Sequence, residues 1–85
     1  MKEFTYVITD QAGIHARPAG LLVKQTQPYA SEVTIVKGDK KGNAKSMLSV
    51  MGLGAKHGEE LTVQAEGPDE DVVITELEDF FKNNL

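Results

Sequence analysis

Residues 60–66, ELTVQAE, alternate apolar and polar side chains along their whole length, with Leu61, Val63 and Ala65 on the same side. This period of two predicts a strand that is buried on one face only. Residues 2–8 and 32–37 repeat the pattern and predict two further strands. Residues 40–44 follow a Gly-Asp turn signal and contain two lysines and a glycine, so they predict a short return strand at an exposed sheet edge. Together these strands form a sheet with one apolar face, which helices must cover.

Three other segments have the apolar spacing of helices. Residues 16–27 end before Pro28, which cannot continue a helix. Ser46 is placed to cap a short helix in MLSVMGLG, and Asp69 is placed to cap a final helix that runs to the end of the printed sequence. The element order β-α-β-β-α-β-α predicts a two-layer α+β fold, with residues 1–85 as a single domain. The predicted buried faces are Ala19, Leu22, Val23 and Thr26 in the first helix, and Val73 (or Ile74), Leu77, Phe80 and Phe81 in the last.

The composition excludes several classes of protein. The 85 residues contain no Cys, so neither a disulfide scaffold nor a thiolate metal site is available. His15 and His57 are the two histidines and lack suitably spaced carboxylates, so we expect no metal site and no cofactor. The formal net charge of −4 argues against a nucleic-acid partner. No segment approaches the ~20 apolar residues of a membrane span, and residues 1–10 resemble a strand rather than a signal peptide, so we expect no membrane insertion and a cytoplasmic protein.

The charges are unevenly distributed along the chain. Seven of the nine basic side chains lie in residues 1–50, together with only four of the thirteen acidic ones. This basic part of the chain also carries the motif GIHARPAG at 13–20. Acidic protein surfaces can be steered toward such a region, although an acidic second half can also serve only to keep a protein soluble.

The motif GIHARPAG combines groups that suit a phosphate. His15 lies where a loop meets the first helix, and Pro18 fits the first turn because its missing N–H would have no partner there. The backbone N–H groups of Ala16 and Arg17 are then free to bind an anion, and the Arg17 guanidinium adds a fixed charge. A phosphoimidazole at His15 is labile and suits onward transfer, and the chain has no glycine-rich nucleotide loop. Donor and acceptor must then be other proteins, unless His15 is only a surface helix cap.

A second cluster follows at 46–53. Met47, Leu48 and Met51 are predicted to point outward while Val50 and Leu53 face the core. Such an apolar, flexible patch can accept several protein partners through small transient interfaces of about 1,200 Å² or less. The alternatives are that these side chains are merely half-buried and that Ser46 is only an N-cap. His57, in a polar turn beside glycine, is predicted to be a solvated loop residue.

Three stretches together closely resemble the histidine-containing phosphocarrier (HPr) family of the bacterial sugar phosphotransferase system, in its Gram-positive type. They are GIHARPAG at 13–20, AKSMLSVMGLG at 44–54 and GEELTVQAEGPDED at 58–71. The resemblance covers essentially the whole chain and is most specific around His15. It implies an open-faced β-sandwich, a four-stranded antiparallel sheet covered on one face by three helices.

The resemblance also implies roles for individual residues. His15 resembles the residue that enzyme I phosphorylates to pros-phosphohistidine with phosphoenolpyruvate as the source, and Arg17 with the N–H groups of Ala16 and Arg17 resembles its phosphate-binding surroundings. Ser46 resembles the regulatory serine modified by the ATP-dependent HPr kinase/phosphorylase. The phosphoryl group would pass to IIA domains of sugar permeases, making the protein a carrier rather than an enzyme, and we expect a monomer. A catabolite-control transcription regulator is a further candidate partner. The implied docking residues are Gly20, Lys24, Met47, Leu48 and Met51.

Two positions depart from the family pattern. Ala12 stands where relatives commonly have Ser or Asn, which removes one hydrogen bond to His15 or its phosphate, and Gln27 stands where many have Lys. Two alternative functions stay open. One is a purely regulatory module that acts through Ser46, and the other is a nitrogen-related phosphorelay carrier. Regulation-only relatives lack the active histidine, so His15 argues against the first. A metal chaperone would need a Cys pair, and an RNA-binding module would need a basic, aromatic sheet.

Overall fold

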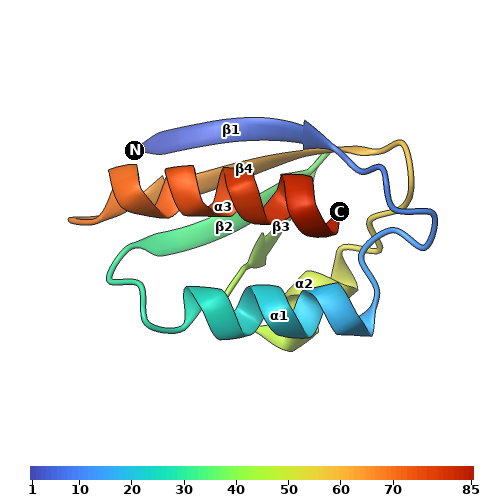
Figure 1. The fold of residues 1–85 in the computed structure, drawn as a ribbon, viewed down its shortest axis with the longest axis horizontal. Helices are drawn as coiled ribbons and strands as arrows, with labels where there is room; N and C mark the ends of the chain where they lie inside the picture. The colour runs from blue at the N-terminus through green and yellow to red at the C-terminus, as the bar shows by residue number, and fades with distance from the viewer.

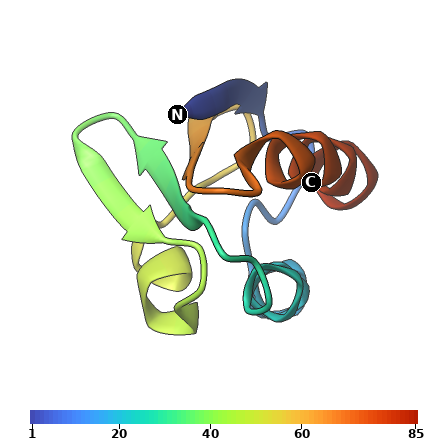
Figure 2. The ribbon, with the colours of Figure 1, turned by 90° about the vertical axis from the view of Figure 1, so that its left-hand side faces the viewer.

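In the computed structural model, residues 1–85 form one four-stranded antiparallel sheet and three helices (Figure 1). The strands lie in the order β1-β4-β2-β3. Figure 2 shows all three helices on one side of this sheet, so the predicted open-faced β-sandwich is confirmed. In chain order the elements are β1 (Lys2–Val7), α1 (Ala16–Thr26), β2 (Glu32–Lys37), β3 (Lys40–Asn43), α2 (Met47–Gly52), β4 (Glu60–Glu66) and α3 (Glu70–Asn84).

The strand register explains why one face of the sheet is apolar. Val63 of β4 lies opposite Phe4 of β1 and Ile35 of β2, so these side chains share the inner face. Thr62 and Gln64 point the other way and belong to the uncovered face. The predicted edge position of β3 is confirmed, since it pairs only with β2.

An aromatic cluster centred on Phe81 ties α3 to the sheet. The Phe81 ring makes edge-to-face contacts with Phe4 and Tyr6 of β1, each at 5.6 Å between ring centres, and with Phe80 at 6.0 Å. Such pairs add stability beyond the apolar area they bury. The predicted stripe of α3 is confirmed, with Val73 rather than Ile74 fully buried. The predicted face of α1 is also buried, except that Val23 is only half-buried.

Asp69 was predicted to cap α3, but its side chain makes no hydrogen bond to the helix N-terminus. It occupies the N-cap position with ψ 20°, outside the extended conformation that a capping side chain needs. Its carboxylate instead accepts hydrogen bonds from the N–H groups of Ala30 (3.0 Å) and Ser31 (2.9 Å) and from the Ser31 hydroxyl. These bonds, the Ser31 hydroxyl first, lower the pKa of Asp69. Asp69 therefore fixes the loop before β2 against the start of α3.

No helix is both long enough and apolar enough to cross a membrane.

Candidate functional site

His15 occupies the N-cap position of α1 in an extended conformation, with φ −112° and ψ −177°. The loop before it is fixed by Gly13, which has φ +67° and lies against the backbone of Ala55. An added Cβ at Gly13 would be 2.4 Å from the Ala55 carbonyl oxygen. The same oxygen accepts a hydrogen bond from the Ile14 N–H at 3.0 Å. This packing presents the His15 side chain, 43% exposed, to solvent.

The N-terminus of α1 leaves hydrogen-bond donors free beside His15. The first intrahelical bond runs from the Ala19 N–H to the His15 carbonyl oxygen at 3.0 Å, so the N–H groups of Ala16 and Arg17 have no backbone acceptor. Pro18 is buried in the first turn and has no N–H. Two free donors at the positive end of a helix can hold an anion such as a phosphoryl group.

A shallow hollow of about 210 Å³ brings His15 and Arg17 together. It is smaller than the ~300–1,000 Å³ of ordinary small-molecule sites, and it is open to solvent. The structure thus places the predicted imidazole and guanidinium at one surface depression. Its lining consists of Asp10, His15, Arg17, Pro18, Leu21, Asn83 and Asn84.

Three polar residues of this hollow, Asp10, Asn83 and Asn84, were not predicted. Figure 1 shows the end of α3 on the same side as the loop between β1 and α1. The carbonyl oxygen of Leu85 accepts hydrogen bonds there from the N–H groups of Thr9 (2.6 Å) and Asp10 (2.8 Å). The sequence carries a weak signal for Asp10, which precedes a glycine in a turn-like DQAG stretch. It carries none for Asn83 and Asn84, because only the tertiary fold brings them here.

Ser46 caps α2 as predicted. Its hydroxyl oxygen accepts a hydrogen bond from the Ser49 N–H at 3.3 Å, and the side chain is half-buried. Val50 and Leu53 are buried, as the spacing predicted. Gly42 of β3 allows α2 to lie close to the sheet, since an added Cβ would be 3.0 Å from the Ser49 carbonyl oxygen.

The predicted docking residues lie on α1 and α2, which contact each other. Leu48 is 85% exposed, and Met47 and Met51 are also exposed. Leu21 of α1, which was not predicted, is exposed as well and lines the His15 hollow. Gly20 has no heavy atom within 4 Å of an added Cβ, and Lys24 is exposed. We name Leu21, Met47, Leu48 and Met51 the apolar patch.

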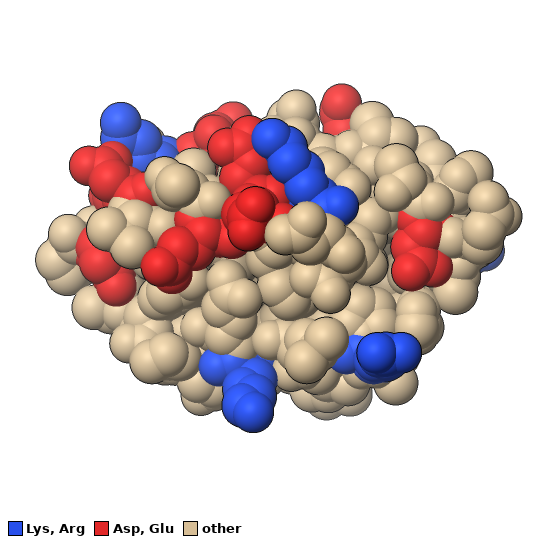
Figure 3. All heavy atoms as spheres, in the orientation of Figure 1, with Lys and Arg blue, Asp and Glu red and all other residues tan.

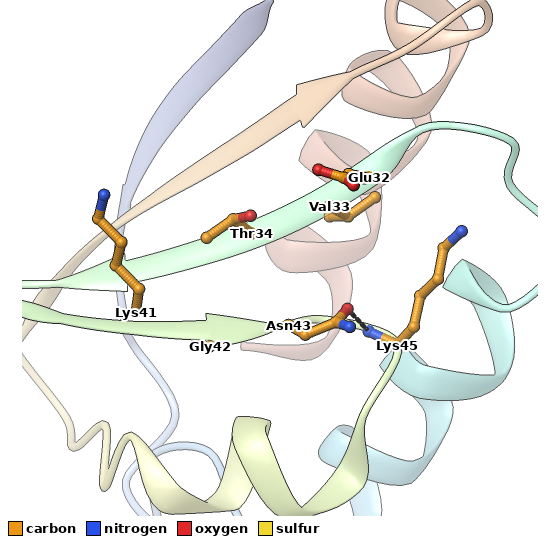
Figure 4. A pocket seen from close by; sticks show the side chains of 7 residues that line it. All are labelled: Glu32, Val33, Thr34, Lys41, Gly42, Asn43 and Lys45. Atoms are coloured by element: carbon orange, nitrogen blue, oxygen red, sulfur yellow. Dashed lines mark hydrogen bonds between the residues drawn. The ribbon is translucent and has the colours of Figure 1, made fainter.

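A second hollow, of about 350 Å³, lies over β2 and β3 (Figure 4). Lys45 lines it, but the Lys45 ammonium group donates to the Tyr29 carbonyl oxygen at 2.6 Å, and none of the predicted site residues takes part.

His57 is exposed, as predicted, and no group of three metal-ligating side chains is present. In Figure 3 the acidic side chains gather over α3, while the side of α1 carries basic ones.

The comparisons with known proteins agree with this fold and site. The family described as "PTS-HPr: PTS HPr component phosphorylation site" matches residues 2–83. The chain is 45% identical over 74 residues to the phosphocarrier protein HPr of Mycoplasma capricolum, covering 87% of this chain and 83% of that protein. It is 45% identical over 77 residues to the HPr of Lysinibacillus sphaericus, covering 91% and 88%.

Among solved structures, a histidine-containing phosphocarrier protein described in connection with the divergence of Mycoplasma from Gram-positive bacteria superposes with a TM-score of 0.94. It is 39% identical in sequence, with coverage of 96% of this chain and 93% of that one. Both the sequence and the arrangement of strands and helices are therefore shared over nearly the full length. The chain belongs to the HPr family of phosphocarrier proteins of the phosphotransferase system.

Proposed function

We propose that this protein accepts a phosphoryl group from phospho-enzyme I on His15 and passes it to the IIA domains of sugar permeases. The observation that carries the proposal is the position of His15. Its exposed ring shares an open hollow with Arg17 and lies beside the free N–H groups of Ala16 and Arg17. A nucleophile, a guanidinium and helix N-terminal donors are thus available to one phosphoryl group.

The chemistry requires little beyond positioning and charge. A lone pair of the imidazole attacks phosphorus, and the bond from phosphorus to the donor breaks with its electron pair staying on the donor. Arg17 and the two N–H groups then hold the phosphoryl oxygens. The hollow is open and small, so the donor and acceptor sites reach it on the surfaces of partner proteins.

The apolar patch supports docking of these partners next to His15. Leu21 lines the His15 hollow itself, and α2 with its three exposed side chains packs beside α1. Gly20 leaves space for close approach of a partner surface, and Lys24 offers a positive charge to an acidic one. Exposed methionine and leucine side chains adapt to more than one partner, which a carrier needs.

Regulation through Ser46 is the second part of the proposal. A phosphate on the Ser46 hydroxyl adds about −1.5 to −2 charges next to the patch side chains Met47 and Leu48. That charge repels acidic partner surfaces and suits partners that carry arginine, such as a catabolite-control transcription regulator. We assign the modification to the ATP-dependent HPr kinase/phosphorylase, and it is tested by the loss of labelling in Ser46→Ala. Equal labelling of Ser46→Ala would place the regulatory site elsewhere.

The carrier function is tested with purified enzyme I and labelled phosphoenolpyruvate. We expect an acid-labile adduct on the wild-type protein and on His57→Ala, whose ring does not line the His15 hollow, and none on His15→Ala. An adduct of equal yield on His15→Ala would overturn the assignment. If no protein is labelled while Ser46 is still modified by the kinase, the alternative of a purely regulatory module is favoured.

A further inference from the structure

We propose that Asp10 is a positioning residue for His15. Its carboxylate holds the imidazole proton on Nε2, so that the Nδ1 lone pair is the one that takes the phosphoryl group. The inference rests on the proposed function for its consequence in phosphoryl transfer, but the geometry that supports it belongs to the unphosphorylated protein alone.

Asp10 is fixed by one hydrogen bond from its backbone and one to its side chain. Its N–H donates to the Leu85 carbonyl oxygen at 2.8 Å, and its Oδ1 accepts from the Ala12 N–H at 2.8 Å. These bonds leave Oδ2 free, and Oδ2 lies 3.8 Å from His15 Nε2. The pair is partly shielded, with 31% of the Asp10 side chain and 43% of the His15 side chain exposed.

No other side chain that lines the hollow carries a negative charge. Arg17 is the only other charged residue that lines the hollow, and it has no acceptor for an imidazole N–H. The amides of Asn83 and Asn84 complete the polar lining, and Asn84 donates to the Phe80 carbonyl oxygen at 2.9 Å. The imidazole makes no hydrogen bond to the N-terminus of α1. Among the side chains that line the hollow, Asp10 is therefore the one whose negative charge favours one tautomer.

The tautomer decides which nitrogen can react. A neutral imidazole has one N–H and one nitrogen with a free lone pair. A carboxylate beside Nε2 favours the proton on that atom, as in histidines whose second nitrogen is fixed by a carboxylate. The Nε2–Oδ2 separation of 3.8 Å is longer than a hydrogen bond, so in the unphosphorylated protein the carboxylate acts on the Nε2 proton through its charge.

The same arrangement serves both directions of transfer. When Nδ1 forms its bond to phosphorus, the bond to the donor breaks and its electron pair leaves with the donor. The proton stays on Nε2, so the phosphorylated ring gains positive charge opposite the Asp10 carboxylate. When the phosphoryl group leaves for an acceptor, the electron pair of the N–P bond returns to Nδ1 and the Nε2–H tautomer is restored. No other reactant is needed.

Asp10→Asn tests the proposal because the amide oxygen can still accept from the Ala12 N–H while the charge is removed. The measurement is the ratio of Nε2–H to Nδ1–H tautomers of His15, obtained by ¹⁵N NMR on the unphosphorylated protein without partners. We expect the Nε2–H form to dominate in the wild type, and the ratio to fall about two- to fivefold in Asp10→Asn, as for a partly exposed charge pair. The rate of phosphoryl transfer from enzyme I follows the fraction of the Nε2–H tautomer rather than the ratio, so it should also fall, but by a smaller factor.

Two controls keep the result decisive. Asp39→Asn removes a carboxylate in the exposed turn between β2 and β3 and should change neither the ratio nor the rate. Asp10→Ser replaces Asp10→Asn in the test if Asp10→Asn folds poorly, because the serine hydroxyl also offers an oxygen to the Ala12 N–H. The tautomer ratio should fall in Asp10→Ser as well. An unchanged tautomer ratio in folded Asp10→Asn or Asp10→Ser overturns the proposal. If His15 of the wild type is never phosphorylated, the proposed function fails while the NMR result still decides the role of Asp10.

Discussion

Replacing Gly13 by alanine should both destabilise the fold and displace His15. Gly13 has φ +67°, where a Cβ costs about 1–2 kcal/mol, offset by about 0.4–1 kcal/mol from the less flexible unfolded chain. The new Cβ would also lie 2.4 Å from the Ala55 carbonyl oxygen and 2.8 Å from Lys56 Cα. Both neighbours are backbone atoms, so relieving the overlap requires a backbone shift that costs about 1–3 kcal/mol.

Gly54→Ala is the matched control for this change. Gly54 has a similar φ of +60°, but nothing lies within 4 Å of its added Cβ. It carries the conformational cost without the overlap, so the difference between the two variants isolates the steric term. We expect Gly13→Ala to lower the free energy of unfolding by about 1–3 kcal/mol more than Gly54→Ala does.

Urea unfolding at neutral pH measures both variants. The domain should have only about 4–13 kcal/mol of total stability, so this difference is easily resolved. The backbone shift should also weaken the bond from the Ile14 N–H to the Ala55 carbonyl oxygen, and thus slow labelling of His15 by enzyme I. Equal destabilisation by Gly13→Ala and Gly54→Ala would refute the argument that close packing of this loop positions His15.

Three further predictions concern other parts of the molecule. Folding lowers the pKa of Asp69, so its carboxylate stabilises the protein above its unfolded-state pKa, and this stabilisation is lost as the pH falls through its folded-state pKa. The difference in free energy of unfolding between the wild type and Asp69→Asn, measured in urea, should therefore shrink in acid. A difference that stays constant with pH would contradict the prediction. Burial and a 2.6 Å bond to Glu76 raise the pKa of Tyr29 to about 12, so the contribution of Tyr29 to stability should be lost as the pH rises from 10 toward 12. Urea unfolding should show a smaller fall in stability over this range for Tyr29→Phe than for the wild type, and an equal fall in both would refute the assignment. Leu48→Ser should leave the free energy of unfolding within about 0.5 kcal/mol while lowering the apparent affinity for enzyme I about fivefold or more, and an unaltered affinity would exclude Leu48 from the docking surface.

The sequence predicted those features that local physics determines. The strand Glu60–Glu66 is identified at both ends because its alternation is uninterrupted, and Ser46 is identified as a cap because it directly precedes an apolar turn. The same reasoning failed for Asp69, whose residue type fits an N-cap but whose carboxylate bonds to Ala30 and Ser31, more than thirty-five positions away.

The polar surroundings of His15 could not be predicted for the same reason. The contact that brings the end of α3 to the site joins Thr9 to Leu85, which are separated by 76 positions. At Ala12 the sequence showed only the loss of a polar side chain near His15. In the structure the backbone N–H of Ala12 donates to Asp10 and fixes that carboxylate beside the His15 ring. A site that looked incomplete in sequence thus has a carboxylate from a neighbouring position.

The carrier function itself is tested most directly by following one phosphoryl group through two transfers. Enzyme I, labelled phosphoenolpyruvate and an isolated IIA domain are combined with and without this protein. We predict that label reaches the IIA domain rapidly when the wild-type protein is present, and not when it is omitted or replaced by His15→Ala. Transfer supported equally well by His15→Ala would contradict the central claim.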